Sequence, residues 1–196
     1  MINVIDNFLP AADWERCLDY FKGGNWQFPP LSGQTNKTCV WRIFNPSIEA
    51  TIGNILYNRL RSLDIPPLAV KRVGINGATT FNESHCHIDG PLGDYSLVWF
   101  GSSKWESSWD GRLRVFHDEE CWKTAGMTKK PDIARGVTKI EYIPNRAILF
   151  PAHLAHIPET PSIDARNNLR TSVGLHLTPA NEWNYIYIPR NNNGYI

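Results

Sequence analysis

Two stretches in the first third of the chain repeat apolar residues at helical spacing. Each predicts an amphipathic helix, the first over residues 10–23 and the second over residues 46–63. Gly23 and Gly24 end the first stretch, and Pro46 stands near the start of the second. The apolar faces comprise Trp14, Cys17, Leu18 and Phe21 in the first stretch, and Ile48, Ile52, Ile55, Leu56 and Leu60 in the second.

From residue 68 onward the pattern changes to short runs of β-branched and aromatic residues, separated by Gly, Pro, Asn and Asp. Such runs are typical of β-strands bounded by turns. The runs are LAVKRVGI, HCHID, YSLVWF, RLRVFH, KIEYI, AILFP and RTSVGLHL. Two helices followed by these strands predict a mainly β fold with flanking helices, in which the helices buttress a β-sandwich or jelly roll.

The length of 196 residues fits one domain with a sizeable core. We expect residues 1–67 to form a helical N-terminal support, residues 68–180 the jelly-roll core and residues 181–196 a C-terminal tail. Residues 118–136 are polar, lie between two predicted strands, and are expected to form a loop.

Composition and charge exclude some classes of protein. The net charge of +1 argues against a nucleic-acid binder held mainly by phosphate electrostatics. No run approaches the roughly 20 apolar residues that a membrane span needs, and the N-terminus does not resemble a signal peptide. The four cysteines are scattered, so a reducing, cytoplasmic location without disulfides is the simplest interpretation. Oligomeric state stays open.

The segment ESHCHIDGP places His85, His87 and Asp89 at alternate positions. On a strand these three side chains would share one face. Residues four apart on a strand are separated by about 13 Å, too far for ligands that each lie about 2.1 Å from one metal. A metal would therefore use either His85 with His87 or His87 with Asp89, and a third ligand from a distant strand.

A second group of polar residues follows the apolar run AILFP. His153 and His156 lie just beyond that run, and Arg170 opens the run RTSVGLHL. On this strand Ser172, Gly174 and His176 share the face of Arg170, whereas the apolar residues occupy the other face. An arginine on a buried strand needs an anionic partner, and its planar fork suits a bound carboxylate.

The chain carries, in this order, His-x-Asp, a distal His and Arg-x-Ser. With this ordered set it resembles the Fe(II)/2-oxoglutarate-dependent oxygenases, most closely the prolyl-hydroxylase-like branch with its small phage and bacterial relatives. The resemblance covers roughly residues 70–177. It implies a cupin-like double-stranded β-helix, that is a jelly roll, with two buttressing N-terminal helices. It also implies that Fe(II) is bound by His87, Asp89 and His156, with His153 as the alternative third ligand.

The resemblance further implies how the cosubstrate is held. Arg170 matches the arginine that binds the distal carboxylate of 2-oxoglutarate, and Ser172 matches the hydroxyl that often assists it. Asn76 resembles an asparagine that contacts the keto-acid end in some nucleic-acid demethylases, although in NGAT it could equally be a turn residue. Phe100 stands where prolyl hydroxylases often carry a tyrosine, and Asp110 replaces the first glycine of a Gly-Gly turn.

Four further residues are candidates for contact with substrate or with the metal ligands. His85 shares the strand face of His87 and Asp89, and His176 shares that of Arg170. Trp99 and Phe100 lie on the strand YSLVWF. Three of them have a structural alternative: His85 as a hydrogen-bonded structural histidine, His176 as a cap on the barrel, and Trp99 as a core residue.

The implied activity is a dioxygenase that oxidises a C–H bond and releases succinate and CO₂, with Fe(II), 2-oxoglutarate and ascorbate as a supporting reductant. A prolyl or other peptidyl residue is one substrate class; a free amino acid or a small natural product is the other. Two rivals remain. One is a two-histidine cupin, an isomerase or metal enzyme using His85 and His87, and the other is a jelly-roll binding module without catalysis.

Overall fold

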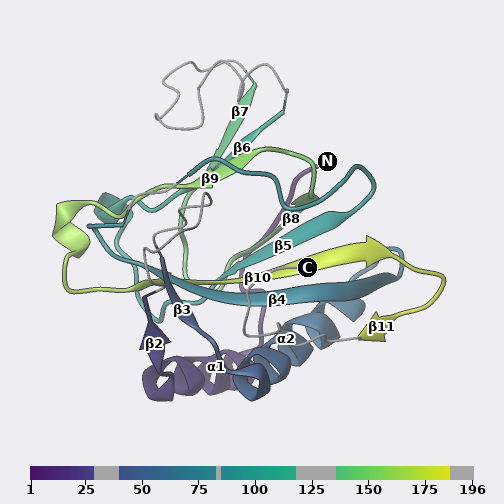
Figure 1. Ribbon diagram of the computed structural model, residues 1–196, viewed down its shortest axis with the longest axis horizontal. Coiled ribbons are helices and arrows are strands. Elements are labelled where there is room, and N and C mark those ends of the chain that lie inside the picture. The colour runs from purple at the N-terminus through teal and green to yellow at the C-terminus, as the bar shows by residue number, and fades with distance from the viewer. Residues whose placement is uncertain (29–39, 83–84, 118–135, 186–196) are drawn as a thin grey trace.

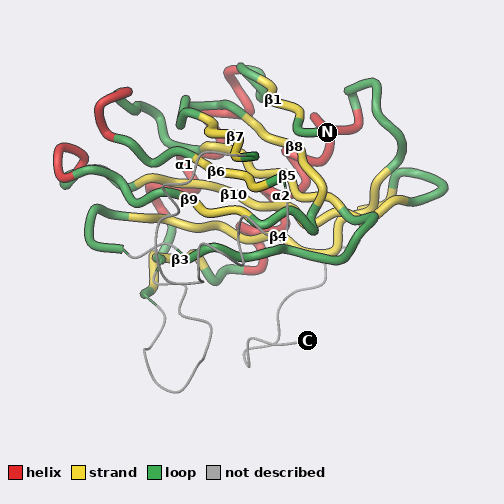
Figure 2. Tube along the Cα trace, turned by 90° about the horizontal axis from the view of Figure 1, so that it is seen from above, coloured by secondary structure: helices red, strands yellow, loops and turns green. Residues whose placement is uncertain are grey.

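The structure is a computed structural model that describes residues 1–28, 40–82, 85–117 and 136–185. Three layers are visible in Figure 1: two helices, a large antiparallel sheet above them, and a small sheet above that. Seen from above in Figure 2, strands fill the centre and loops gather at the two ends. A mainly β fold with two buttressing helices is thus confirmed.

The large sheet has the strand order β1-β8-β5-β10-β4-β3-β2, with β11 pairing beside β4. All of its pairings are antiparallel except that of β11 with β4. The strands are β1 (Asn3–Ile5), β2 (Trp26–Gln27), β3 (Trp41–Ile43), β4 (Leu68–Ala78), β5 (Tyr95–Phe100), β8 (Ala147–Pro151), β10 (Arg170–Pro179) and β11 (Asn184–Tyr185).

The small sheet has the order β7-β6-β9 and faces the large one. Its strands are β6 (Leu113–Phe116), β7 (Val137–Ile140) and β9 (His156–Pro158). An isolated antiparallel bridge between His87 and His156 extends this sheet beyond β9. Two short 3-10 helices, η1 (Ser107–Trp109) and η2 (Ile163–Ala165), lie in the loops.

Helix α1 spans Ala11–Gly23 and helix α2 spans Pro46–Arg61, close to the predicted bounds. Asn45 caps α2, because its side-chain oxygen accepts hydrogen bonds from the backbone N–H groups of Ser47 and Ile48. Pro46 occupies the first turn, where its missing N–H costs nothing.

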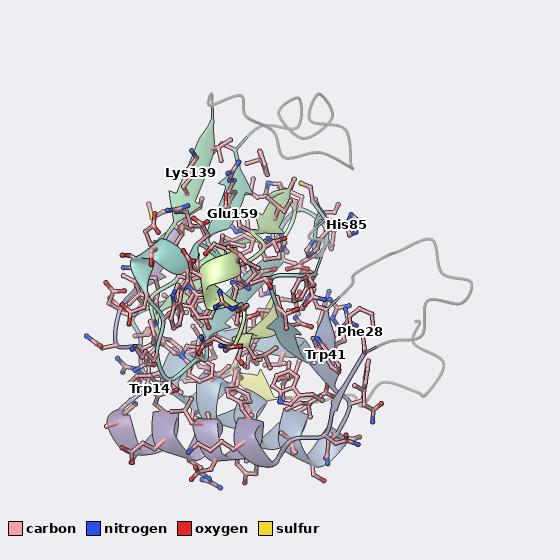
Figure 3. The ribbon with its side chains drawn as sticks, turned by 90° about the vertical axis from the view of Figure 1, so that its left-hand side faces the viewer. Trp14, Phe28, Trp41, His85, Lys139 and Glu159 are labelled. Carbon is pink, nitrogen blue, oxygen red and sulfur yellow. The ribbon has the colours of Figure 1, made fainter. Side chains whose placement is uncertain are left out.

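Apolar side chains form two main core layers. One lies between the helices and the outer face of the large sheet, and includes Cys17, Leu56 and Trp99. The other lies between the two sheets, and includes Phe100, Val115 and Phe150. In Figure 3 Trp14 marks the helix side of the molecule, and Lys139 and Glu159 mark the small sheet. The inner face of the large sheet is the one turned toward the small sheet.

Three features differ from the sequence-based expectation. Residues 1–67 supply not only helices but also β1, β2 and β3 of the large sheet. HCHID is not a regular strand, because pairing there is limited to the single bridge at His87. In the expected tail, residues 184 and 185 form β11, whereas residues 186–196, and residues 118–135 of the expected loop, lie outside the described part.

The sequence predicts no disulfides and no membrane span, and the described residues bear on both. Cys17 and Cys86 are free thiols, and Cys39 and Cys121 lie outside the described residues. None of the helices described here is long and apolar enough to cross a membrane.

Candidate metal and cosubstrate site

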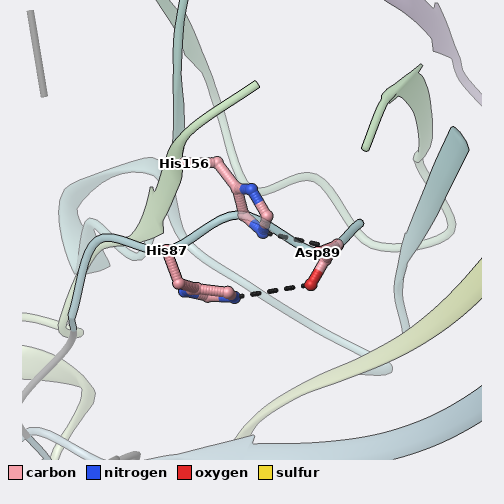
Figure 4. Close-up of side chains that lie close together, drawn as sticks. All are labelled: His87, Asp89 and His156. Carbon is pink, nitrogen blue, oxygen red and sulfur yellow. Dashed lines mark ion pairs between the residues drawn. The ribbon is translucent and has the colours of Figure 1, made fainter. Parts of the chain in front are cut away.

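The side chains of His87, Asp89 and His156 point toward one another, and one ligand atom from each lies within 4.8 Å of those of the other two (Figure 4). Nε2 of His87 lies 3.7 Å from Oδ1 of Asp89, and Nε2 of His156 lies 3.5 Å from Oδ2. Two neutral imidazoles and one carboxylate in this arrangement suit a divalent transition metal and leave further coordination positions open.

Backbone hydrogen bonds join the two segments that carry these ligands. The N–H and C=O groups of His87 and His156 exchange hydrogen bonds of 3.0 and 2.9 Å, and the N–H of Asp89 donates to the carbonyl of Ala152 at 3.0 Å. The ligands from the His-x-Asp segment and from β9 are therefore fixed relative to each other by the main chain.

A main-chain carbonyl group faces Nδ1 of each of the two candidate ligand histidines. Nδ1 of His87 lies 3.0 Å from the carbonyl oxygen of His85, and Nδ1 of His156 lies 3.1 Å from that of Leu154. A carbonyl only accepts, so each Nδ1 must carry the proton and donate. Nε2 of each ring faces a carboxylate oxygen of Asp89.

Burial and neighbouring charges favour the ligand forms of these groups. Burial, helped by nearby His87, lowers the pKa of His156 to about 4, so this imidazole is neutral near pH 7. Burial alone would raise the pKa of Asp89, but His156, His176, His87 and the Ser96 hydroxyl outweigh it and hold that pKa below its ordinary value. Asp89 is thus favoured as the carboxylate anion.

Arg170 lies on β10 of the large sheet, on the face turned toward the small sheet, and is only 3% exposed. Its Nε donates to the carbonyl of Gly111 at 2.6 Å, and its Nη2 is buried without a hydrogen-bond partner among the described residues. Burial lowers the pKa of this guanidinium to about 10, against the attraction of Tyr142 and Glu159. A buried cation with an unused donor is costly unless an anion binds it.

Two aromatic rings position the Arg170 guanidinium. Its Cζ lies 4.8 Å from the ring centroid of Tyr142 and 5.4 Å from that of Phe100, and the two rings stack on each other. The Tyr142 hydroxyl donates to the carbonyl of Thr171 and so faces away from the site. Phe100 therefore contributes an aromatic surface for Arg170 and, unlike a tyrosine, has no hydroxyl to donate.

The inner face between Arg170 and the metal ligands is lined by residues in cross-strand register. Ser172 on β10 pairs with Phe100 on β5 and with Asn76 on β4. Asn76 is thus a strand residue rather than a turn residue. A Cβ atom added at Gly174 would meet no heavy atom within 4 Å, so this face has open space between Ser172 and His176.

Other predicted residues lie apart from this face. Trp99 is fully buried in the core beneath the helices and donates from its indole N–H to Asn145, so the expected contact with substrate is wrong for this residue. Alternation along β5 turns it away from the site when Phe100 faces it. His85 (labelled in Figure 3) and His153 each hold one buried ring nitrogen without a hydrogen-bond partner among the described residues, and neither joins the metal-binding group.

Sequence reasoning missed three supporting residues: Ser96, Gly111 and Tyr142. Ser96 could have been found, since it alternates with Phe100 on YSLVWF and therefore shares its face. The contacts of Gly111 and Tyr142 with Arg170 depend on how distant loops and strands meet, which no local pattern shows.

Comparisons with known proteins show which solved structures share this fold. No protein-family model and no curated protein sequence matches the chain. Among the solved structures that resemble it are a prolyl hydroxylase from Trichoplax adhaerens in complex with a hypoxia inducible factor oxygen degradation domain peptide fragment, a prolyl-4-hydroxylase from Pseudomonas putida, and HygX from Streptomyces hygroscopicus with nickel, 2-oxoglutarate and hygromycin B bound.

Each likeness is extensive in structure and low in sequence. The Trichoplax enzyme gives a TM-score of 0.58 at 14% identity, covering 91% of this chain and 83% of that one. For the Pseudomonas enzyme the TM-score is 0.54 at 13% identity, and the match covers 91% of this chain and 92% of that one. For HygX the TM-score is 0.61 at 10% identity, and the match covers 91% of this chain and 83% of that one. The resemblance inferred from the sequence is confirmed at the level of the fold: this chain has the jelly-roll fold of the Fe(II)/2-oxoglutarate-dependent oxygenases.

Proposed function

We propose that this protein is a non-haem Fe(II)- and 2-oxoglutarate-dependent dioxygenase that oxidises a C–H bond of its substrate. The observation that carries this proposal is a pair of sites between the two sheets. His87, Asp89 and His156 form a group suited to Fe(II), and Arg170 offers a buried cation whose Nη2 has no partner among the described residues.

In this proposal Nε2 of His87, Nε2 of His156 and one oxygen of Asp89 hold the metal. Their tautomers are fixed beforehand by the carbonyl groups of His85 and Leu154, so binding does not require the rings to reorient. Bound Fe(II) would supply the activation of dioxygen, which no protein side chain can provide. Asp89 supplies the only negative charge of the set.

Arg170 would bind the distal carboxylate of 2-oxoglutarate through its terminal nitrogens, since its Nε is already engaged by Gly111. Ser172, whose side chain shares the face of Arg170, would add a hydroxyl donor, and Asn76 lies beside Ser172 on β4. The open space over Gly174 is where the rest of the cosubstrate could lie. This arrangement would hold the cosubstrate between Arg170 and the metal.

The two-histidine cupin is less well supported. It requires His85 to join His87 as a ligand, but the metal-binding group found among the described residues contains Asp89 and His156 instead. It also gives no role to Arg170. The solved structures that resemble this chain include one bound to a peptide and one bound to a small molecule, so both substrate classes enter the test.

Succinate release tests the proposal. Purified protein with Fe(II), ascorbate and 2-oxoglutarate is expected to form succinate slowly alone and faster with its substrate. Proline-containing peptides form one screening pool, and free amino acids with small natural products form the other. Asp89→Ala is the inactive control. Metal-loaded protein that binds 2-oxoglutarate but forms no succinate with either pool would favour a binding module.

A further inference from the structure

One cross-strand row of the large sheet lies directly behind the metal-binding group. Ser96 on β5 pairs with Phe150 on β8 and with His176 on β10, and His176 pairs with Arg72 on β4. Directly paired residues project from the same face of a sheet. All four side chains therefore point toward the small sheet and the metal ligands.

Each member of this row contacts a ligand or another member. The Ser96 hydroxyl donates to Oδ2 of Asp89 at 2.7 Å, and the ring of Phe150 packs edge-on against His156 with centroids 5.0 Å apart. Nδ1 of His176 lies 3.2 Å from the carbonyl oxygen of Asp89, and Nε2 of His176 lies 2.5 Å from a guanidinium nitrogen of Arg72.

The two contacts of His176 define its tautomer. A carbonyl only accepts hydrogen bonds, so Nδ1 must donate, and a guanidinium only donates, so Nε2 must accept. His176 is therefore a neutral imidazole that links Arg72 to the main chain of Asp89. Its Nε2 lone pair is used by Arg72, although that atom lies only 3.4 Å from Oδ1 of Asp89.

A role of His176 as a fourth metal ligand does not fit this geometry. Ligands on opposite sides of one ion are separated by about 4.2 Å at most, given bonds of about 2.1 Å. The group whose ligand atoms all lie within 4.8 Å of one another comprises His87, Asp89 and His156, and His176 is not part of it.

We propose that His176 is a positioning residue for the metal: held by Arg72, it fixes the backbone of Asp89, while Ser96 fixes the carboxylate. This inference rests on the proposed function only in taking His87, Asp89 and His156 as metal ligands. Hydrogen bonds behind a ligand set its orientation, and their loss costs about 10- to 100-fold in metal affinity.

Metal titration of the apoprotein tests this role without using activity. Co(II) serves as a spectroscopic probe, and Fe(II) is titrated under anaerobic conditions. His176→Leu is expected to weaken Co(II) binding by about 10- to 100-fold and to change the visible spectrum of the bound ion. His176→Asn should recover most of the affinity, because its amide N–H can donate to the Asp89 carbonyl in place of Nδ1.

Two further variants complete the design. Ser96→Ala should weaken binding by about tenfold through its own hydrogen bond to Asp89, and it carries the test should His176→Leu fail to fold. His117→Leu is the matched control, since His117 is exposed and contacts Thr138 away from the site. The affinity of metal-saturated protein for 2-oxoglutarate should stay unchanged in His117→Leu, because this variant touches neither Arg170 nor the metal-binding group.

The outcomes separate this inference from the proposed function. Unchanged Co(II) affinity and spectrum in His176→Leu or Ser96→Ala would overturn the positioning role, even if the melting temperature fell. An Asn variant as weak as the Leu variant would overturn the hydrogen bond to Asp89. Wild-type protein that binds Co(II) through these residues but has no affinity for 2-oxoglutarate would contradict the dioxygenase and leave the positioning role intact.

Discussion

The Nε of Arg170 donates a hydrogen bond to the carbonyl oxygen of Gly111 at 2.6 Å, although 59 residues separate them in the chain. Gly111 adopts a φ of +79°, and a Cβ built on it would lie 2.9 Å from Cδ of Arg170. The turn before β6 thus holds the guanidinium, and only glycine satisfies both its backbone conformation and this close approach.

Gly111→Ala should therefore displace Arg170 and weaken 2-oxoglutarate binding by about tenfold, equivalent to about 1.4 kcal/mol. Gly93→Ala is the matched control, because Gly93 also has a positive φ but no heavy atom within 4 Å of an added Cβ. Both variants should lose stability through backbone strain. Isothermal titration of metal-loaded protein measures the affinity; equal affinities in the two variants would contradict the role of Gly111.

Metal should stabilise the folded protein, because the ligand group exists only when distant segments meet. At a free metal concentration of 100 times Kd the gain is about 2.7 kcal/mol, which for a chain of this size raises the melting temperature by about 5–10 °C. Asp89→Ala should abolish the increase. Asp94→Ala should retain it, since Asp94 pairs with Lys71 outside the ligand group. Thermal unfolding with Mn(II) or Co(II) measures both.

His156 rather than His153 should be the third ligand. His156→Ala is expected to lose metal binding, whereas His153→Ala should retain it within about threefold, or less than 1 kcal/mol. Nε2 of His156 faces Asp89 at 3.5 Å, and His153 does not join the metal-binding group. The opposite result in a Co(II) titration would show that His153 is the ligand.

The ring of Tyr142, not its hydroxyl, should matter for cosubstrate affinity. Tyr142→Leu removes the aromatic face from Arg170 and should raise the Kd for 2-oxoglutarate by about 2- to 30-fold, corresponding to about 0.5–2 kcal/mol for a cation–π contact. Tyr142→Phe keeps that face and should bind normally. It should nevertheless unfold more easily, because the backbone N–H of Ser102 and the Ser102 hydroxyl lose their buried partner. Equal affinities of Tyr142→Leu and Tyr142→Phe for 2-oxoglutarate would count against the aromatic contact.

Long apolar runs made the central strands predictable. YSLVWF and AILFP, residues 95–100 and 147–151, coincide with β5 and β8, because buried strands bounded by turn residues leave a clear local signal. The short strands β1, β2 and β3 were missed. The three residues of β1 pair with β8, far away in the chain, and such pairing is decided by tertiary context.

The candidate site likewise has a part that the sequence predicts and a part that it does not. The ligand types and spacing of His87, Asp89 and His156 are visible in the sequence, as is the alternation that gives Arg170 and Ser172 one face. The contacts that support these residues are not visible in the sequence, because they follow from cross-strand register and loop packing. The strand predicted for HCHID shortened to one bridge, since the N–H of Asp89 donates to Ala152 instead of continuing a ladder.

Anaerobic titration of the Fe(II)-loaded protein with 2-oxoglutarate tests the central claim most directly. Removing Arg170 leaves a buried carboxylate unpaired, at a cost of about 2–5 kcal/mol. Arg170→Ala should therefore raise Kd by roughly thirty-fold to several thousand-fold, while Fe(II) affinity stays nearly unchanged. Arg170→Lys should recover only part, because an ammonium keeps the charge and loses the fork. Wild-type affinity for 2-oxoglutarate in Arg170→Ala would contradict the account.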